Sequence, residues 1–252
     1  MQEKDNFICG INPVYEALKA AKRRCYKIVV EEGKGHSRIR AITDLARPQG
    51  VRVETLARPA FQQKYHSCSH QGIVAYFSDK LTVELADLIQ QAFQSDPQPT
   101  LVLLDEIQDP HNMGAIIRSA EVLGVQGIII PKHRSAPLNE TVAKCSAGAM
   151  EMMPIAWVTN LAQAIEELKQ AGFWTVGVDI EGEKKSCQFD FNMPVALVIG
   201  GEEKGVRPGL RKVCDFTVSI PMRGTIGSLN ASAAAAVIFY EILRQKELAR
   251  HK

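Results

Sequence analysis

From residue 99 onward, short apolar segments alternate with longer segments of helical spacing. The apolar segments are "LVLLDEI", "GIIIP", "PIAWV", "WTVGVDI", "VALVIGGEE" and "DFTVSI", and "GAIIRSAEVLG" and "LAQAIEELKQAG" lie between them. Continuously apolar strands are buried on both faces, and helices that connect them cover those faces. The pattern therefore predicts an α/β fold with a mostly parallel sheet.

A second, smaller α/β unit is expected before this sheet. "GINPVYEALKAAKR" has an early Pro and helical spacing, and "CYKIVVEE", "VRVETLA" and "QGIVAYF" are strand candidates. The segment "QSDPQPT" cannot continue a helix, because its prolines lack the amide hydrogen. We therefore predict a first domain at 1–78, a linker at 79–98 and a second domain at 99–252.

Charge is unevenly distributed along the 252 residues. The formal net charge is +2, but residues 1–78 hold 13 Lys and Arg against 7 Asp and Glu, a balance of +6, which leaves −4 for the remainder. A basic first domain suits a polyanionic partner, although a solvated basic surface explains it equally well. No apolar run is long enough to cross a bilayer, and the first residues lack the pattern of a secretory signal, so the cytoplasm is the expected location.

The cysteines give no sign of a disulfide framework or a zinc site. Six are scattered without a C-x-x-C pair, which predicts reduced thiols. His66, Cys68 and His70 alternate on one short segment, and three ligands so placed make a poor tetrahedral site. No metal is expected.

Three loops following predicted strands carry unusual polar residues. In open α/β sheets, ligands bind beyond the carboxyl ends of the strands. Each loop also has a purely structural reading, as a helix cap or a tight turn. None matches G-x-G-x-x-G or the P-loop, which disfavours a dehydrogenase. The loops carry, in chain order, Asn112 and Arg118, then Glu202 and Glu203, then Ser228 and Asn230.

In this order the three loops resemble the SpoU branch of the SPOUT RNA ribose 2′-O-methyltransferases. "NMGAIIR" matches a first motif of Asn and Arg, "GGEEKG" matches G-x-E-x-x-G, and "IPMRGTIGSLN" matches I-P-M followed by S-L-N. The resemblance covers residues 99–247. Residues 6–78 look like the small L30e-like RNA-binding domain that many of these enzymes carry in front.

The resemblance implies a deep trefoil knot, in which the last segment of the chain is threaded through a loop of the sheet. Crossing backbones leave little space for side chains, which suits "GTIGSLNASAAAA". It also implies a homodimer in which the last helix, with "AVIFYEIL", faces the partner, although burial within one subunit explains that segment equally well.

The resemblance implies S-adenosyl-L-methionine as the methyl donor. Its expected contacts are the backbone at Gly200, Ile220 and Leu229, with Gly201, Met222 and Gly205 beside them. Arg118 has been regarded as the base of this family. A guanidinium is always protonated, so our preferred hypothesis is that Arg118 holds the adjacent phosphate and stabilises alkoxide charge. Asn112 is expected to orient Arg118 or the ribose, Glu202 to anchor the loops, and Ser228 and Asn230 to position the target nucleotide.

The domain order most resembles bacterial enzymes that methylate a guanosine ribose in large-subunit ribosomal RNA. The alternatives are a transfer RNA methyltransferase and, in a different class, a non-catalytic RNA-binding protein. RNA backbone contacts are expected from the first domain, with a solvated helix surface as the plain alternative. The candidates are Lys19, Lys22, Arg23, Arg24 and Lys27.

Overall fold

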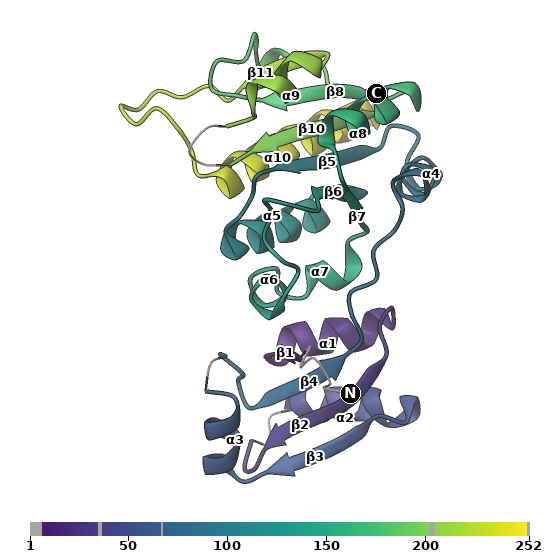
Figure 1. Ribbon diagram of the computed structural model, residues 1–252, viewed down its shortest axis with the longest axis vertical. Helices are drawn as coiled ribbons and strands as arrows, with labels where there is room; N and C mark the ends of the chain where they lie inside the picture. The colour runs from purple at the N-terminus through teal and green to yellow at the C-terminus, as the bar shows by residue number, and fades with distance from the viewer. Residues whose placement is uncertain (1–6, 35–36, 67, 202–204, 251–252) are drawn as a thin grey trace. The chain divides into compact units, whose positions relative to one another are not determined.

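The computed structural model describes residues 7–34, 37–66, 68–201 and 205–250, and it divides the chain into two compact units (Figure 1). The first unit comprises residues 1–81 and 137–152, and the second comprises 82–136 and 153–252. The division near residue 81 lies close to the predicted boundary. The segment 137–152 differs from the prediction, since it groups with the first unit although it follows strands of the second.

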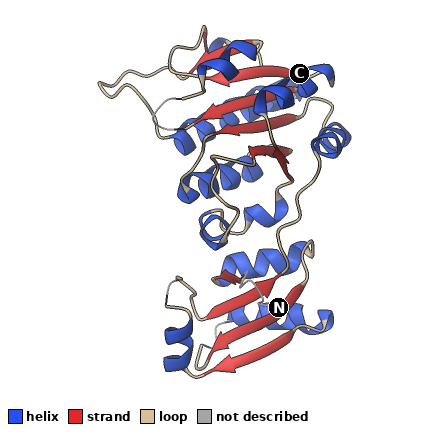
Figure 2. Ribbon diagram, in the orientation of Figure 1, coloured by secondary structure: helices blue, strands red, loops and turns tan. Residues whose placement is uncertain are grey.

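The first unit is built on a four-stranded sheet of order β1-β4-β2-β3, in which only β2 and β3 are parallel. Helices accompany this sheet (Figure 2). Its elements are β1 (Phe7–Cys9), α1 (Ile11–Ala20), β2 (Cys25–Glu31), α2 (Ser37–Ala46), the 3₁₀ turn η1 (Arg47–Gln49), β3 (Arg52–Leu56), α3 (Arg58–Lys64), β4 (Ile73–Phe77), α6 (Glu140–Cys145) and α7 (Ala149–Met152).

Apolar and charged contacts both hold this unit together. Phe61 and Tyr65 are fully buried and pack with Val29 and Val74 in one core cluster. The segment 137–152 is attached by a buried ion pair, in which Arg23 Nη1 lies 2.8 Å from Glu151 Oε1. Removing one partner of such a pair is costly because the other charge stays buried. The ion pair explains why 137–152 belongs with this unit.

The expectation of reduced thiols is wrong for two of the six cysteines. Cys9 and Cys68 form a disulfide that spans 59 residues, while Cys25, Cys145, Cys187 and Cys214 are free. Cys9 ends β1, and its partner precedes β4, which pairs with β1 in antiparallel fashion. That pairing brings distant sulfurs together without any local spacing signal. Glu140 Oε2 lies 3.7 Å from Cys9 Sγ, and burial raises the pKa of the Glu140 carboxyl.

The second unit contains a seven-stranded sheet of order β7-β6-β5-β10-β8-β11-β9, and all its strand pairs are parallel. This confirms the predicted α/β class. The elements are α4 (Leu85–Ser95), β5 (Thr100–Asp105), α5 (Pro110–Val122), β6 (Gly127–Pro131), β7 (Ile155–Val158), α8 (Leu161–Gln170), β8 (Trp174–Val178), β9 (Lys184–Lys185), η2 (Ser186–Gln188), β10 (Val195–Gly200), α9 (Pro208–Val213), β11 (Phe216–Ser219) and α10 (Ala231–Arg250).

Helices cover both faces of the parallel sheet (Figures 1 and 2). Leu101 and Leu103 of β5 pack in one cluster with residues of α4, α8 and α9. Successive strand residues point to opposite faces, so Val102 and Leu104 point to the other face. There α10 packs against α5 and β10. The predicted linker 79–98 therefore contains a core helix, since α4 buries Leu85, Leu88 and Ala92.

Within the described ranges, no helix combines the length and apolar character needed to cross a membrane. The trefoil knot implied by the resemblance stays a prediction.

Candidate functional site

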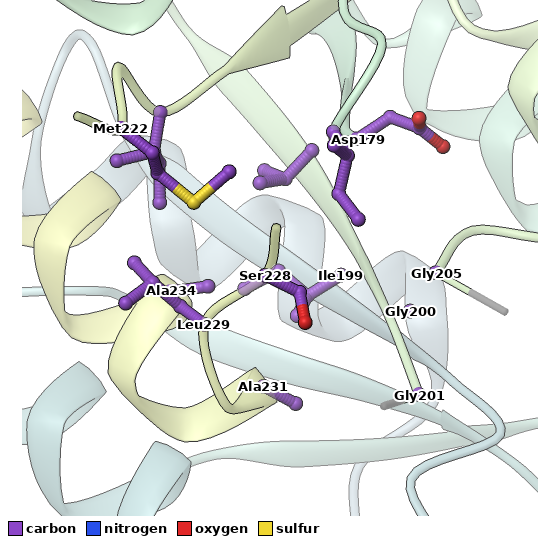
Figure 3. Close-up of a pocket in the computed structure, with 13 residues that line it drawn as sticks. Asp179, Ile199, Gly200, Gly201, Gly205, Met222, Ser228, Leu229, Ala231 and Ala234 are labelled. Carbon is purple, nitrogen blue, oxygen red and sulfur yellow. The ribbon is translucent and has the colours of Figure 1, made fainter. Parts of the chain in front are cut away.

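A pocket lies where β8, β10 and β11 end, in the second unit. It is lined mainly by apolar atoms, with Met222, Ser228 and Leu229 on one side and Gly200, Gly201 and Gly205 on the other (Figure 3). Parallel strands place all their carboxyl ends at the same edge of a sheet, which is why segments distant in the sequence meet here.

All six residues expected to contact the methyl donor line this pocket. Ser228, expected to position the nucleotide, lines it as well. Sequence reasoning did not select the remaining lining residues, which are Val178, Asp179, Ile180, Ile199, Ala231 and Ala234. Asp179 and Ile180 follow β8, and no motif in "WTVGVDI" distinguished that loop from an ordinary strand end.

The glycines of the pocket are required by a close backbone approach. A Cβ placed on Gly200 would lie 1.9 Å from the carbonyl carbon of Gly205, far inside any tolerated contact. Gly205 has φ of +58° and donates its amide hydrogen to the Gly201 carbonyl at 3.0 Å. The backbone of Gly205 therefore packs directly against the end of β10. Backbone groups, rather than side chains, face the pocket at this point.

An ion pair between a buried carboxylate and a partly exposed guanidinium holds the backbone at Arg207. Asp105, at the end of β5, is fully buried, and its Oδ1 lies 2.8 Å from Arg207 Nε and 2.7 Å from Nη2. Its Oδ2 accepts a hydrogen bond from the Arg207 backbone amide at 3.0 Å. The hydrogen bond to Asp105 raises the pKa of Arg207 above its usual value. The signal for this pair was a carboxylate ending the apolar run "LVLLD", which sequence reasoning missed.

The first and third motifs meet through two asparagines. Asn230 Nδ2 donates to Asn112 Oδ1 at 3.0 Å, and Asn112 is 8% exposed. Asn230 Oδ1 accepts from the Ser232 amide at 2.9 Å at the start of α10. One side chain thus caps α10 and ties it to α5. The first and third motifs are therefore in direct contact.

Arg118 lies on α5, is exposed, and is not among the residues that line the pocket. In the part of the chain that the structure describes, its guanidinium has no ion pair or hydrogen bond. Glu202 and Glu203 lie outside the described residues, so the expected pairing of Arg118 with Glu202 stays a prediction.

The candidate RNA contacts on the first unit differ in accessibility. Arg23 has a side chain only 6% exposed and is paired with Glu151, so it is unsuited to a phosphate contact. Lys22 Nζ donates to the Met152 carbonyl at 2.9 Å, and Lys27 lies 3.7 Å from Glu54. Lys19 and Arg24 are exposed.

Family models match both units. The SpoU rRNA Methylase family matches residues 99–240, and the RNA 2′-O ribose methyltransferase substrate binding family matches residues 7–82. Both matches agree with the resemblance drawn from the motifs.

Curated relatives match over nearly the whole chain. The putative TrmH family tRNA/rRNA methyltransferase YacO of Bacillus subtilis is 40% identical and covers 98% of each chain. The 23S rRNA (guanosine-2′-O-)-methyltransferase RlmB of Pseudomonas aeruginosa is 38% identical and covers 95% of this chain and 96% of its own.

Solved structures of SpoU methyltransferases share the fold of this chain. The SpoU methyltransferase AviRb of Streptomyces viridochromogenes superposes with a TM-score of 0.81 at 26% identity, covering 96% of this chain and 90% of its own. Its complex with AdoMet gives a TM-score of 0.78 at 29% identity with the same coverage. The sequence matches and the shared fold lead to one assignment: this chain belongs to the SpoU rRNA methylase family.

Proposed function

We propose that the chain transfers a methyl group from S-adenosyl-L-methionine to a ribose 2′-hydroxyl of RNA, and that the target is a guanosine of 23S ribosomal RNA. The observation that carries this proposal is the pocket at the ends of β8, β10 and β11, where Gly200, Ile220 and Leu229 meet. The guanosine target is supported by the 38% identity to the Pseudomonas aeruginosa protein.

The pocket residues fit this methyl donor. Backbone groups at Gly200 and Gly205 would hold its adenine by hydrogen bonds, and Met222 and Leu229 would supply an apolar surface. The bound donor supplies an electrophilic methyl group carried on a sulfonium. The Asp105–Arg207 pair holds the backbone of Arg207 in place, two residues after the pocket residue Gly205.

Arg118 is proposed as the residue that contacts the reacting nucleotide. A 2′-hydroxyl is a weak nucleophile, and it gains negative charge as its proton leaves. The permanent charge of the Arg118 guanidinium stabilises that oxygen and holds the adjacent phosphate through paired hydrogen bonds. Water or a phosphate oxygen then accepts the proton. Asn112, Glu202, Ser228 and Asn230 position the ribose and the loops.

The first unit is proposed to bind the RNA substrate, with Lys19, Lys22, Arg24 and Lys27 as backbone contacts. Its net positive charge supports this role. Arg23 is omitted, because Glu151 neutralises it inside the unit.

A homodimer is also proposed, with α10 at the interface. Val237, Tyr240 and Leu248 of this helix are 43%, 59% and 54% exposed, which is a large apolar surface for one helix. The cytoplasm is the proposed location, since ribosomal RNA is the proposed substrate.

The test is methyl transfer from tritiated S-adenosyl-L-methionine to unmodified 23S ribosomal RNA and, separately, to unmodified transfer RNA. Label in 23S RNA alone supports the proposal, and label in transfer RNA alone favours the alternative target. Calorimetry with S-adenosyl-L-methionine tests the second alternative, a non-catalytic RNA-binding protein. That alternative predicts a chain that binds RNA but does not bind the methyl donor.

A further inference from the structure

The first unit contains a cavity of about 490 Å³ to which no role has been given so far. Its polar lining comes from Asn12, Tyr15 and Glu16 on α1 and from Arg38 on α2, and Ala147 lines it as well. A volume of this order is typical of pockets that hold small organic ligands. All of these residues belong to the same compact unit.

Several polar groups of the cavity have no hydrogen-bond partner among the described residues. Arg38 Nη1 donates to Asn12 Oδ1 at 3.0 Å, and the rest of its exposed guanidinium has no recorded ion pair or hydrogen bond within the described ranges. The Tyr15 hydroxyl and the Glu16 carboxylate are half-buried and likewise have no hydrogen-bond partner among the described residues.

Glu31 and Glu54 of the same unit have ion-pair partners. Glu31 lies 3.4 Å from Arg58 Nε, and Glu54 lies 3.0 Å from Arg52 Nε. Glu16, in contrast, is a half-buried acceptor that lines a cavity and has no ion pair among the described residues. The exposed part of this carboxylate is open to the cavity, where it can accept hydrogen bonds from a bound ligand.

An aromatic ring, a guanidinium and a carboxylate around one cavity match the parts of a nucleotide. Unstacked RNA bases pack on aromatic rings and are read by hydrogen bonds along their edges. A guanidinium pairs with the phosphate through two parallel hydrogen bonds. The surplus of positive charge in residues 1–78 attracts the RNA backbone.

A carboxylate in this position selects among the bases. Guanine alone presents two adjoining donors on its pairing edge, N1–H and the 2-amino group, which match the two oxygens of a carboxylate. Adenine, cytosine and uracil each offer a single donor there, next to an acceptor that a carboxylate repels.

We infer that this cavity binds one unstacked guanine nucleotide of the RNA substrate. Glu16 accepts hydrogen bonds from the base edge, Tyr15 packs against the ring, and Arg38 holds a neighbouring phosphate. This inference rests on the proposed function, because it assigns a second contact for the same RNA, separate from the reacting ribose.

The test uses the full chain and three fluorescently labelled hexanucleotides: one with a single guanosine among uridines, one with inosine in its place, and hexauridylate. Inosine lacks the 2-amino group and loses one hydrogen bond. By anisotropy, we expect the guanosine hexamer to bind about tenfold more tightly than the inosine hexamer, which is the cost of one such hydrogen bond. Hexauridylate should bind more weakly than the inosine hexamer, because uracil also presents an acceptor that the carboxylate repels.

Two variants distinguish recognition of the guanine base by Glu16 from binding of the phosphate by Arg38. Glu16→Gln presents one acceptor instead of two, so the preference for guanosine over inosine falls to about one. Arg38→Ala weakens binding of all three hexamers by about tenfold, because the phosphate contact is common to them. The matched control is Arg40→Ala, which removes the same charge from the same helix at a position about 200° around it; it keeps the guanosine preference and changes affinity less than twofold.

A wild-type chain without guanosine preference, or a Glu16→Gln variant that keeps the wild-type preference, overturns the inference. Failure of the proposed function is seen in a different assay. In that case the wild-type chain transfers no methyl group to 23S or transfer RNA, whether or not it prefers the guanosine hexamer. Where both hold, Glu16→Gln raises the KM for 23S RNA and leaves kcat and the affinity for S-adenosyl-L-methionine unchanged.

Discussion

Asn230 joins two motifs that lie 118 residues apart, since its Nδ2 donates to Asn112 Oδ1 at 3.0 Å while its Oδ1 caps α10. The two tasks use different atoms of one amide group. A substitution that keeps the acceptor and removes the donor therefore separates them.

Asn230→Ser is expected to keep the stability of the chain and to lower its turnover. A serine hydroxyl caps a helix about as well as an asparagine, but it does not reach Asn112 with an amide. Asn230→Ala loses the cap as well, at about 1 kcal/mol. Urea denaturation and methyl transfer measure the two effects.

Asn160→Ala is the matched control, because Asn160 caps α8 by accepting from the Ala162 amide at 2.9 Å. It should lose about the same stability as Asn230→Ala and keep full activity. Equal activity of the wild type and Asn230→Ser would show that the link to Asn112 has no part in function.

Gly200→Ala is expected to destabilise the second unit and to abolish binding of S-adenosyl-L-methionine. Its Cβ would meet the Gly205 backbone at 1.9 Å, and overpacking of this kind costs about 1–3 kcal/mol. The control is Gly209→Ala in α9, where a Cβ meets nothing within 4 Å. Calorimetry on both variants provides the check: normal binding by Gly200→Ala would place the donor elsewhere.

Asp105→Asn is expected to lower stability by about 2 kcal/mol and to weaken binding of the methyl donor by about tenfold. The buried Asp105 holds Arg207 by side-chain and backbone hydrogen bonds, and the partly exposed Arg207 reduces the cost below that of a fully buried pair. Saturating donor should restore most of kcat, because the pair positions the loop rather than the reacting atoms.

The matched control for Asp105→Asn is Asp44→Asn, which breaks the exposed pair between Asp44 and Arg47, 3.8 Å apart. It should change the free energy of unfolding by less than about 0.5 kcal/mol. An unchanged donor affinity in Asp105→Asn would contradict the positioning role of the Asp105–Arg207 pair.

Arg118→Lys is expected to lower kcat by about a hundredfold while donor binding is unchanged. Lysine keeps the charge but lacks the planar pair of donors that holds a phosphate. Single-turnover methyl transfer with saturating RNA measures the chemical step. Near-normal turnover would refute the need for a guanidinium. Arg47→Lys, at a highly exposed position of the first unit, is the control for the substitution itself.

The buried ammonium of Lys246 is expected to make the free energy of unfolding depend on pH. Burial lowers the pKa of its ammonium from 10.5 to about 8. Its Nζ donates to the Gln98 carbonyl and to Thr100 Oγ1. Between those two pKa values the unfolded chain binds more protons, so this group makes the free energy of unfolding rise with pH.

Lys246→Met removes that contribution. The stability of the wild type minus that of the variant should therefore increase as the pH is raised from about 7.5 to about 9.5. Urea denaturation at the two pH values measures it, and a constant or shrinking difference would show that the ammonium is not buried as described.

The parallel sheet followed from the sequence because continuous apolar strands are a local pattern, whereas the expected pocket residues came from the resemblance to the SpoU enzymes. The carboxyl ends of parallel strands lie at one edge of the sheet, where Gly200 ends β10 and Ile220 follows β11. The Asp105–Arg207 pair and the Cys9–Cys68 disulfide join residues 102 and 59 positions apart. No spacing within the sequence indicates that the residues of either pair are in contact.

The grouping of 137–152 with the first unit escaped prediction for a related reason. The helical pattern of "NETVAKCSAGAME" shows which residues are apolar, but not which surface they cover. The partner of Glu151 is Arg23, whose charge looked like part of an RNA-binding surface in the sequence. From the sequence alone, an arginine in a buried ion pair cannot be distinguished from an arginine on an exposed basic surface.

The central claim is that this chain methylates one guanosine ribose of 23S ribosomal RNA through Arg118. The most direct measurement maps 2′-O-methyl groups on ribosomal and transfer RNA from cells with and without the gene, complemented by the wild type or by Arg118→Ala. The account predicts that one 2′-O-methylguanosine disappears from 23S RNA and returns only with the wild-type chain. An unchanged 23S pattern, or restoration by Arg118→Ala, would contradict it.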